Sequence, residues 1–290
     1  GCGKSVTALS IMRLVPNPPG VIESGEVLFE GADLLNIPAK EMQLIRGAGI
    51  GMIFQEPMSS LNPVLTIGRQ ITEPLGVHLG LTGLRAEKRA AELLEMVGIA
   101  DSRRRLKDHP HQLSGGQRQR VMIAIALSCE PKLLIADEAT TALDVTIQAQ
   151  ILELMKSLTT QLGTALLIIT HNLGIIARYA DRLNVMYAGK IRESGTAEQV
   201  YLRPGHPYTV GLLNSVPRLD RPAMERLDQI EGEIPDPANL PTGCAFRLRC
   251  RWATEQCATN EPILQQVEER QLVACFESKA VSDSVEVALQ

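Results

Sequence analysis

The stretch Leu113–Asp144, LSGGQRQRVMIAIALSCEPKLLIADEATTALD, decides the fold and the chemistry that we predict for this chain. A serine and two glycines stand at the predicted start of a helix, and Pro131 ends the helical region. The apolar run Leu133–Ala136 then predicts a buried parallel strand that ends at Asp137 and Glu138. Two carboxylates at a strand end can hold Mg²⁺ and polarise a water molecule, so the stretch predicts a phosphate-hydrolysing site.

The composition fits a globular protein with an ample core. The chain has 290 residues, 44% of them hydrophobic and 21% charged, and a net charge of -4. The negative charge gives no bulk attraction for nucleic acid or anionic lipid. The best apolar run, Ala165–Ile169, is far shorter than the roughly 18 residues that span a bilayer. Without a secretory signal we expect a cytosolic protein, and a start at Gly1 inside a motif predicts an incomplete N-terminus.

Gly1–Ser5, GCGKS, matches the last part of the phosphate-binding pattern G-x-x-x-x-G-K-[ST]. Glycines such as Gly3 let successive backbone N–H groups turn inward onto phosphate oxygens, and the helix after them directs its positive end to the same place. Lys4 would neutralise the β- and γ-phosphates, and Ser5 would hold Mg²⁺. The first glycine of the pattern is not in this chain, so the motif gains weight only in combination with other motifs of the chain.

Two polar residues come after other predicted strands. Ile50–Phe54 ends at Gln55, and Ala165–Ile169 ends just before His171. Either residue alone is more often structural. Next to an Asp-Glu strand end, we interpret the Gln55 amide as a group that reaches Mg²⁺ or the attacking water, and His171 as a contact of the γ-phosphate.

The segment between the first two parallel strands is predicted to be helical. Val64–Gly76 and Arg85–Val97 have apolar residues at helical spacing, and Gly98 is a stop signal. A helical subdomain of about residues 58–130 is therefore inserted into an α/β core. Arg103–Arg105 is too short for a nucleic-acid patch and is more simply a solvated helix face.

Antiparallel strands are expected in two places. Val21–Gly31 alternates and contains glycine turns, which predicts short antiparallel strands. Leu183–Tyr187 and Lys190–Ser194 predict a hairpin that turns at Ala188-Gly189. The fold class is therefore α/β, with an antiparallel region beside a parallel core.

Two helix starts carry candidate functional residues. Ser114 can cap a helix whose first N–H groups lie at Gly115 and Gly116, and Asp144 can cap the next helix. A capped core helix explains "SGG" alone. Five residues of LSGGQ, about twenty before a strand that ends in Asp-Glu, are far more specific.

Together these motifs resemble the ATP-binding subunits of ABC (ATP-binding cassette) transporters. The matching elements, in the order of the family, are GCGKS (Gly1–Ser5, Walker A), Gln55 (Q-loop), Leu113–Gln117 (signature), LLIADE with Asp137 and Glu138 (Walker B), Thr141–Asp144 (D-loop) and His171 (switch histidine). The resemblance implies a P-loop NTPase (RecA-like) core in a cassette of residues 1–202. Ala139 departs from the family, which usually has proline there, but the change removes no catalytic group.

The resemblance also implies how the site works. Two cassettes pair head to tail, and each ATP lies between one P-loop and the partner's signature helix. Ser114, Gly115, Gly116 and Gln117 would serve the partner's nucleotide. The residues that would serve the chain's own ATP and Mg²⁺ are Gly1, Gly3, Lys4, Ser5, Gln55, Asp137, Glu138 and His171, and Asp144 of the D-loop is a further candidate nucleotide-binding residue. Glu138 would act as base and His171 on the γ-phosphate, while Ser5, Gln55 and Asp137 would surround Mg²⁺.

Residues 203–290 resemble the C-terminal extension of the oligopeptide/dipeptide branch of this family, through Gly205–Thr209 (GHPYT), Ile234–Asp236 and Gly243-Cys244. Proline, glycine and loop signals dominate residues 203–245, so we expect a tail over the core rather than a second globular domain. The branch implies an ATPase that powers import of peptides or a related solute. Its partners would be a second ATPase, two membrane permeases and an extracytoplasmic binding protein, at the cytoplasmic face of a bacterial inner membrane.

Four cysteines gather in this extension, at Cys244, Cys250, Cys257 and Cys275. Their spacing, C-x5-C-x6-C-x17-C, matches no common zinc or ferredoxin pattern, so free thiols and a metal site both stay open. Some members of the branch carry an iron–sulfur cluster on four cysteines here. That resemblance favours a [4Fe-4S] cluster over zinc.

A second function is compatible with the same cassette. A soluble ABC ATPase acting on nucleic acid or ribosomes would use Cys244–Cys275 as a zinc module. The single cassette and the negative net charge argue against it, and we expect no nucleic-acid partner.

Overall fold

The computed structural model describes residues 2–55, 60–140, 144–215 and 230–289. Its contacts divide the chain into two compact units. We call Ser5–His171 the core unit, and Gly1–Lys4 together with Asn172–Gln290 the C-terminal unit. The division falls after His171, whereas the domain boundary after residue 202 stays a prediction.

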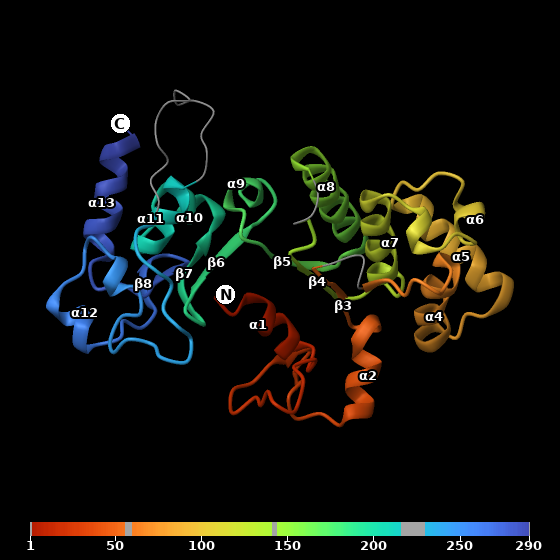
Figure 1. Cartoon of the computed structure of the whole chain (residues 1–290), viewed down its shortest axis with the longest axis horizontal. Helices are drawn as coiled ribbons and strands as arrows, with labels where there is room; N and C mark the ends of the chain where they lie inside the picture. Colours follow the sequence, from red (N-terminus) through yellow and green to blue (C-terminus); the bar gives the residue numbers. More distant parts are fainter. Residues whose placement is uncertain (1, 56–59, 141–143, 216–229, 290) are drawn as a thin grey trace. The chain divides into compact units, whose positions relative to one another are not determined.

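The core unit is built on a three-stranded parallel sheet in the order β3-β4-β5 (Figure 1). Its strands are β3 (Ile50–Ile53), β4 (Leu133–Asp137) and β5 (Ala165–Ile169). All three are short apolar runs, as expected of strands covered on both faces. The three predicted strands are therefore confirmed within one or two residues of their bounds.

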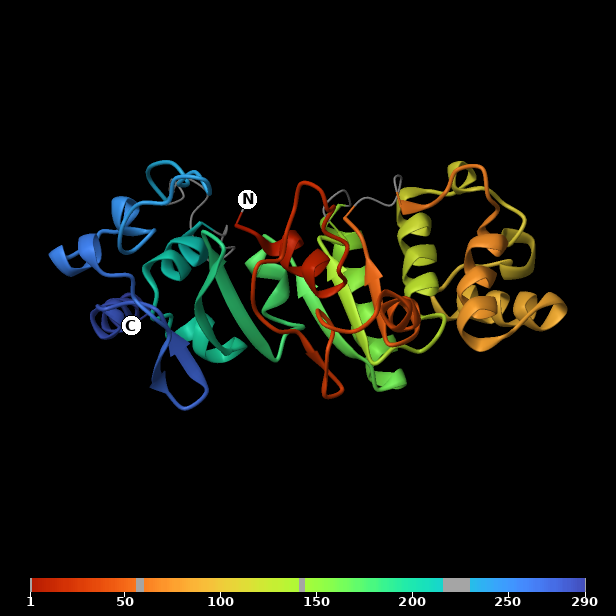
Figure 2. The same cartoon turned by 90° about the horizontal axis from the view of Figure 1, so that it is seen from below.

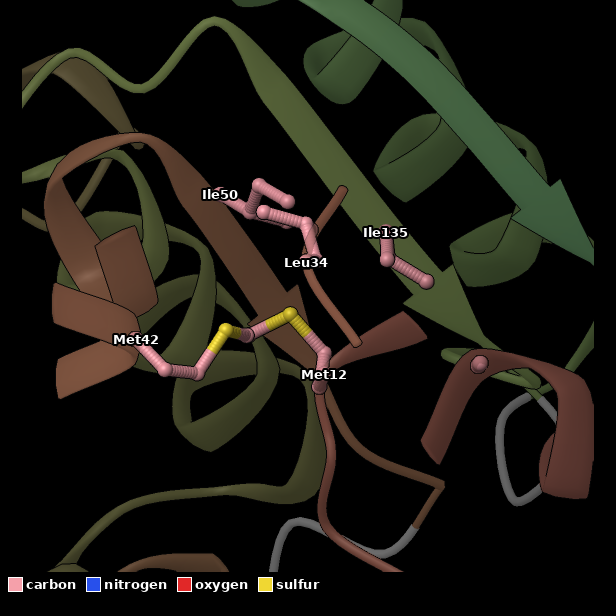
Figure 3. Packing of buried hydrophobic residues seen from close by; sticks show 6 residues of the cluster. Met12, Leu34, Met42, Ile50 and Ile135 are labelled. Atoms are coloured by element: carbon pink, nitrogen blue, oxygen red, sulfur yellow. The ribbon is translucent and has the colours of Figure 1, made fainter. Parts of the chain in front are cut away.

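One face of this sheet carries a core of buried apolar side chains (Figure 3). Met12 directly follows α1 (Lys4–Ile11), Met42 belongs to α2 (Ala39–Ala48), and Ile50 and Ile135 belong to the sheet. The side chains of Met12 and Met42 point toward one another in Figure 3. Because Ile135 precedes the Walker-B-like acids by two residues, this core fixes the strand that carries them.

The other face is covered by α7 (Gly115–Leu127) and α8 (Val145–Leu162), which lie opposite α1 and α2 in Figure 1. Gly51 permits the close approach of α7, since a Cβ there would lie 2.4 Å from the carbonyl oxygen of Ala126. Any larger residue would push the helix away from the sheet. The two covered faces explain why the sequence of β4 is apolar without alternation.

The predicted helical insertion is present. Its helices, in orange to yellow in Figure 2, are α4 (Ile67–Leu79), α5 (Gly83–Met96), α6 (Ser102–Arg105) and α7, with the short turn η1 (Pro110–Gln112) before α7. Thr66 caps α4 by accepting a hydrogen bond from Arg69 N, and Gly80 ends it in the left-handed conformation. Arg103 and Arg104 are exposed, in keeping with a solvated helix face.

The predicted strands of Val21–Gly31 are largely wrong. The structure has one two-residue pair, β1 (Leu28–Phe29) and β2 (Ala32–Asp33), in antiparallel register. The turn between them has positive φ at Glu30 and Gly31, so a tight turn fixes the pair at the end of the predicted segment. The alternation before Leu28 reflects loop residues, and residues 21–26 are exposed.

The C-terminal unit contains a four-stranded antiparallel sheet in the order β6-β7-β9-β8. Its strands are β6 (Arg182–Tyr187), β7 (Lys190–Thr196), β8 (Gln265–Glu268) and β9 (Gln271–Val273). The predicted hairpin is confirmed, with positive φ at both Ala188 and Gly189. The pair β8–β9 was not predicted, and through it the end of the extension shares a sheet with the hairpin.

Helices surround this second sheet. They are α9 (Leu173–Ile176), α10 (Ala197–Leu202), α11 (Pro207–Asn214), η2 (Arg247–Arg249), α12 (Glu255–Thr259) and α13 (Ser278–Leu289). Thr196 caps α10 and His206 caps α11 through their side chains. Among the helices of the described ranges, none combines the length and the hydropathy needed to cross a membrane.

Candidate functional site

The carboxyl ends of the three parallel strands bring the predicted residues of the core unit together. The register pairs Ile53 with Ala136 and Asp137 with Ile169. The residues just beyond these ends, on three neighbouring strands, are Gln55, Glu138 and His171. In open α/β sheets this edge is where ligands bind, so the parallel order itself assembles the candidate site.

Glu138 stands at the centre of the site. Gln55 Nε2 donates a hydrogen bond to Glu138 Oε2 at 2.7 Å, and His171 Nδ1 lies 3.2 Å from Glu138 Oε1. The Glu138 side chain is 15% exposed, whereas His171 is 60% exposed. One carboxylate therefore connects the ends of the two outer strands and still reaches solvent.

The backbone at Glu138 is strained. Its φ is +46°, in the left-handed region that residues other than glycine seldom adopt. Glu138 N donates to Ile169 O at 2.9 Å, which extends the β4–β5 pairing by one residue. Such strain persists where the surrounding structure fixes it, and it directs this side chain to the sheet edge.

A second pair lies at the same strand end. Ser5 Oγ donates to Asp137 Oδ1 at 3.0 Å, and Asp137 is only 5% exposed. Ser5 is in the first turn of α1, where backbone N–H groups have no partner within the helix and can bind an anion. A hydroxyl and a carboxylate at this distance are oxygen ligands of the kind that Mg²⁺ prefers.

The remaining residues of the phosphate-binding motif belong to the C-terminal unit by their contacts. Gly3 has φ +91°, which favours glycine, and Lys4 is the first residue of α1. Gly1 lies outside the described residues. The helix predicted after GCGKS is confirmed, and it begins two residues earlier than expected, at Lys4.

The signature-like segment is a capped helix start. Ser114 Oγ accepts from Gln117 N at 3.3 Å, while Gln117 Oε1 accepts from Ser114 N at 3.0 Å. This reciprocal capping box fixes the first turn of α7, in which Gly115 and Gly116 expose main chain rather than side chains. The predicted cap is confirmed, and the turn offers backbone donors to a ligand.

The start of α8 lies next to the start of α7. Asp144 Oδ1 accepts from Ile147 N at 2.9 Å and so caps α8 as predicted. A Cβ on Gly116 would be 3.5 Å from Cγ2 of Ile147, so the two helix starts are in contact. The other D-loop residues, Thr141–Leu143, lie outside the described residues.

The four cysteines of the extension line one apolar cavity. The other residues around it include His206, Phe246 and Trp252. Burial raises the pKa of Cys244, that of Cys250 to about 11 and that of Cys275 to about 12, so as free groups these thiols stay protonated. The donor set suits a soft metal or cluster. In the described ranges, however, no three Cys, His, Asp or Glu side chains are arranged to hold a metal ion.

Comparison with known proteins agrees with this geometry. A family model described as "ABC transporter" matches residues 1–141, and one described as "Oligopeptide/dipeptide transporter, C-terminal region" matches residues 192–257. The oligopeptide transport ATP-binding protein AppD of Bacillus subtilis (strain 168) is 52% identical over 95% of this chain and 84% of its own length. OppD of the same organism is 53% identical over 94% of this chain and 76% of its length.

Solved structures lead to the same class. The ATP-binding cassette MJ0796, solved as a dimer in a post-hydrolysis state with ADP and Pi, has a TM-score of 0.59 and 31% identity, over 68% of this chain and 81% of its own. CbiO1 from Clostridium perfringens has a TM-score of 0.59 and 30% identity, over 69% of this chain and 75% of its own. The chain is thus a P-loop ATPase cassette. It belongs to the family of ABC transporter ATP-binding proteins, in the branch with the oligopeptide/dipeptide transporter C-terminal region.

Membership in this branch confirms the transporter interpretation and favours it over a nucleic-acid ATPase. The enzymatic activity of the family is ATP hydrolysis coupled to transport, and ATP with Mg²⁺ is its substrate complex. The sequence did not predict one feature of the site, the contacts of Cys2 with Gly189 and Tyr208, which belong to the same unit. The GHPYT motif was the available signal, because it contains the tyrosine that makes one of those contacts.

Proposed function

We propose that this chain hydrolyses ATP at the carboxyl ends of β3, β4 and β5, with Glu138 as general base. The observation that carries the proposal is the position of the Glu138 carboxylate between Gln55 and His171. Before ATP binds, these two side chains would hold the carboxylate. When ATP binds, Glu138 takes a proton from the attacking water, and His171 turns to the γ-phosphate.

The same proposal assigns the cation and phosphate ligands. Ser5 and Asp137 would hold Mg²⁺, which neutralises phosphate charge when bound, and Gln55 would complete its shell or orient the water. Gly1, Gly3 and Lys4 would surround the β- and γ-phosphates. The 3.0 Å contact between Ser5 and Asp137 supports this assignment, since it brings two oxygen ligands together before the metal arrives.

Ser114, Gly115, Gly116 and Gln117 would bind the nucleotide of a partner cassette in a head-to-tail dimer, with Asp144 at the adjoining helix start. The backbone donors in the first turn of α7 and the contact of this turn with the start of α8 support the role. Dimerisation is then part of the chemistry, because one chain would not complete a site.

The transported solute is proposed to be an oligopeptide or dipeptide. The names of the relatives, oligopeptide transport and peptide import ATP-binding proteins, support this cargo. The partners would be an identical or homologous ATPase, two membrane permeases and an extracytoplasmic binding protein. The chain would then associate peripherally with the cytoplasmic face of the inner membrane, through the permeases.

Reconstitution tests the whole proposal. The natural protein is assembled in proteoliposomes with the partner ATPase, the permeases and the binding protein encoded beside it, and uptake of a labelled tripeptide is measured with ATP or with a non-hydrolysable analogue. Uptake that requires hydrolysis supports the proposal. Co-purification of nucleic acid in place of a permease, with no peptide uptake, would sink it.

The finer proposal for the extension is a [4Fe-4S] cluster on Cys244, Cys250, Cys257 and Cys275. Four thiols on one cavity supply the donor set, and metal binding would replace their protons. The cluster has no role in the hydrolytic steps above. Anaerobically purified protein is expected to be brown and to contain iron and sulfide; colourless protein without iron contradicts the proposal, and bound zinc would replace it with a zinc site.

A further inference from the structure

Two residues of the phosphate-binding motif, Cys2 and Gly3, contact residues far along the chain within the C-terminal unit. Gly189 N, in the β6–β7 turn, donates to Cys2 O at 3.1 Å. A Cβ built on Gly3 would lie 3.5 Å from Gly189 Cα, so the two segments are in close contact. The Cys2 Sγ lies 4.0 Å from the hydroxyl oxygen of Tyr208. Main chain and side chain of Cys2 therefore both meet residues far along the sequence.

Tyr208 itself is held by aromatic packing. Its ring centroid is 4.6 Å from that of Tyr187 and 5.6 Å from that of Phe246, and both partners are buried. Burial, and next the neighbouring Cys2, raise the pKa of the Tyr208 hydroxyl well above its usual value. The hydroxyl thus stays protonated and able to donate at physiological pH.

The backbone before Tyr208 is fixed by a buried carboxylate. Glu193 of β7 accepts hydrogen bonds from Gly205 N at 2.7 Å and from His206 N at 3.1 Å. His206 Nδ1 in turn accepts from Tyr208 N at 3.0 Å and caps α11. Glu193 of the antiparallel sheet therefore holds the backbone that leads into Tyr208.

We propose that Tyr208 of the GHPYT segment is a positioning residue for the phosphate-binding loop, acting through Cys2. The inference rests on the proposed nucleotide site, because the loop must bind phosphate for its position to matter. In this proposal the tyrosine of the GHPYT segment increases the affinity for ATP.

The expected consequence is a change in binding rather than in chemistry. Backbone N–H groups bind phosphate best when the loop is already in its bound conformation, and ordering a loosened loop costs affinity. Tyr208 touches neither water nor the γ-phosphate in this scheme. Loss of its contact should raise the Kd for nucleotide and the KM for ATP, and leave kcat nearly unchanged.

Two substitutions of Tyr208 in the natural protein should raise the Kd for nucleotide by different amounts. Tyr208→Phe keeps the ring packing and removes the hydroxyl; one weak hydrogen bond corresponds to roughly 2- to 5-fold in the Kd for a fluorescent ATP analogue. Tyr208→Leu also removes the aromatic contacts and should weaken binding about 10-fold or more. In both variants kcat at saturating ATP should stay within about twofold. The control is Tyr201→Phe, whose hydroxyl donates to Leu173 O in the same unit, and which should leave the Kd unchanged.

A double-mutant cycle with Cys2→Ala isolates the contact. Tyr208→Phe should have no further effect on the Kd in the Cys2→Ala background, and additive effects would overturn the role of Cys2. Lys4→Ala separates this inference from the proposed site. If Lys4→Ala loses nucleotide binding while both Tyr208 variants keep an unchanged Kd, only the positioning role is refuted. If Lys4→Ala binds nucleotide as before, the proposed nucleotide site itself is refuted.

Discussion

Two glutamates, Glu138 and Glu193, follow opposite designs in the two units of this protein. Glu138 lies at the open end of a parallel strand, and its carboxylate contacts two side chains, Gln55 and His171. Glu193 lies within β7, fully buried, and accepts from two backbone amides and from Gln271 Nε2 at 3.0 Å. The first carboxylate is held by two exposed side chains; the second is held largely by the main chain.

The difference shows which observation identifies a functional acid. Burial raises the pKa of Glu193, and a perturbed carboxyl is a common sign of an active site. Yet no solvent reaches Glu193, and its carboxylate oxygens accept hydrogen bonds from the backbone of Gly205 and His206. Glu138 is less buried, but it stands where three strand ends meet. Position and the exposure of the partner side chains, more than burial of the carboxylate, distinguish the proposed catalytic group from the structural one.

The largest expected effect tests Glu138. Glu138→Gln keeps the shape and removes the base, so ATP turnover should fall by about 10²- to 10⁴-fold while nucleotide still binds. Phosphate release at saturating ATP measures the fall, and gel filtration should detect an ATP-bound dimer. Glu153→Gln, on the exposed side of α8 in the same unit, is the matched control. Undiminished turnover would remove Glu138 from the mechanism.

The next effect tests Glu193 as a structural group. Glu193→Leu leaves the N–H groups of Gly205 and His206 buried without their acceptor, which costs about 3 kcal/mol of unfolding free energy. Urea unfolding measures the loss through the midpoint, at constant m. Glu233→Leu, at an exposed position of the same unit, should stay within about 0.5 kcal/mol. A stable Glu193→Leu variant would contradict the structural role.

A third prediction uses pH, because His206 lies beside the same loop. Burial, and next the charge of Arg192, lower the pKa of His206 to about 3, below its ordinary 6.5. Below pH 6.5 the unfolded chain binds a proton at this histidine that the folded chain does not bind. The free energy of unfolding therefore decreases as the pH is lowered from 6.5 toward 3. This one group should cost about 2 kcal/mol at pH 5.

His206→Asn tests that assignment. Asparagine can still accept a hydrogen bond from Tyr208 N but does not titrate in this range. The variant should therefore lose about 2 kcal/mol less stability than the unaltered protein between about pH 7.5 and pH 5. Urea midpoints at the two pH values give the comparison. Equal losses in both proteins would show that another group causes the acid sensitivity.

The contrast also explains how much the sequence could predict. Gln55, Glu138 and His171 each come after an apolar run, and parallel strands align their carboxyl ends, so their meeting could be inferred without coordinates. The caps at Ser114 and Asp144 could also be predicted, because each is made within the first turn of its own helix. The fold class and the family follow from these motifs in order.

The network of Glu193 could not be predicted in this way. Its partner Gln271 is far along the chain, in a three-residue strand, β9, that joins β7 by long-range pairing of Val273 with Glu193 and of Leu272 with Ser194. Cys2 and Tyr208 are likewise separated by most of the sequence. In Val21–Gly31, alternation predicted strands, but the tight turn at Glu30-Gly31 placed the pair later. Long-range pairing and turn position, rather than local pattern, decided these features.

The smallest expected effect compares the two amides that donate to these glutamates. Gln271 is 2% exposed and also donates to Arg203 O at 3.0 Å, so Gln271→Leu should cost about 1–2 kcal/mol of stability and leave turnover per folded molecule unchanged. Gln55 is exposed, so Gln55→Leu should change stability by less than about 0.5 kcal/mol and yet lower ATP turnover. Urea midpoints and phosphate release on both variants decide the matter. Each amide reports on the carboxylate that it contacts. The division into a catalytic and a structural glutamate would therefore fail if Gln271→Leu slowed hydrolysis as much as Gln55→Leu. It would also fail if Gln55→Leu were the less stable variant.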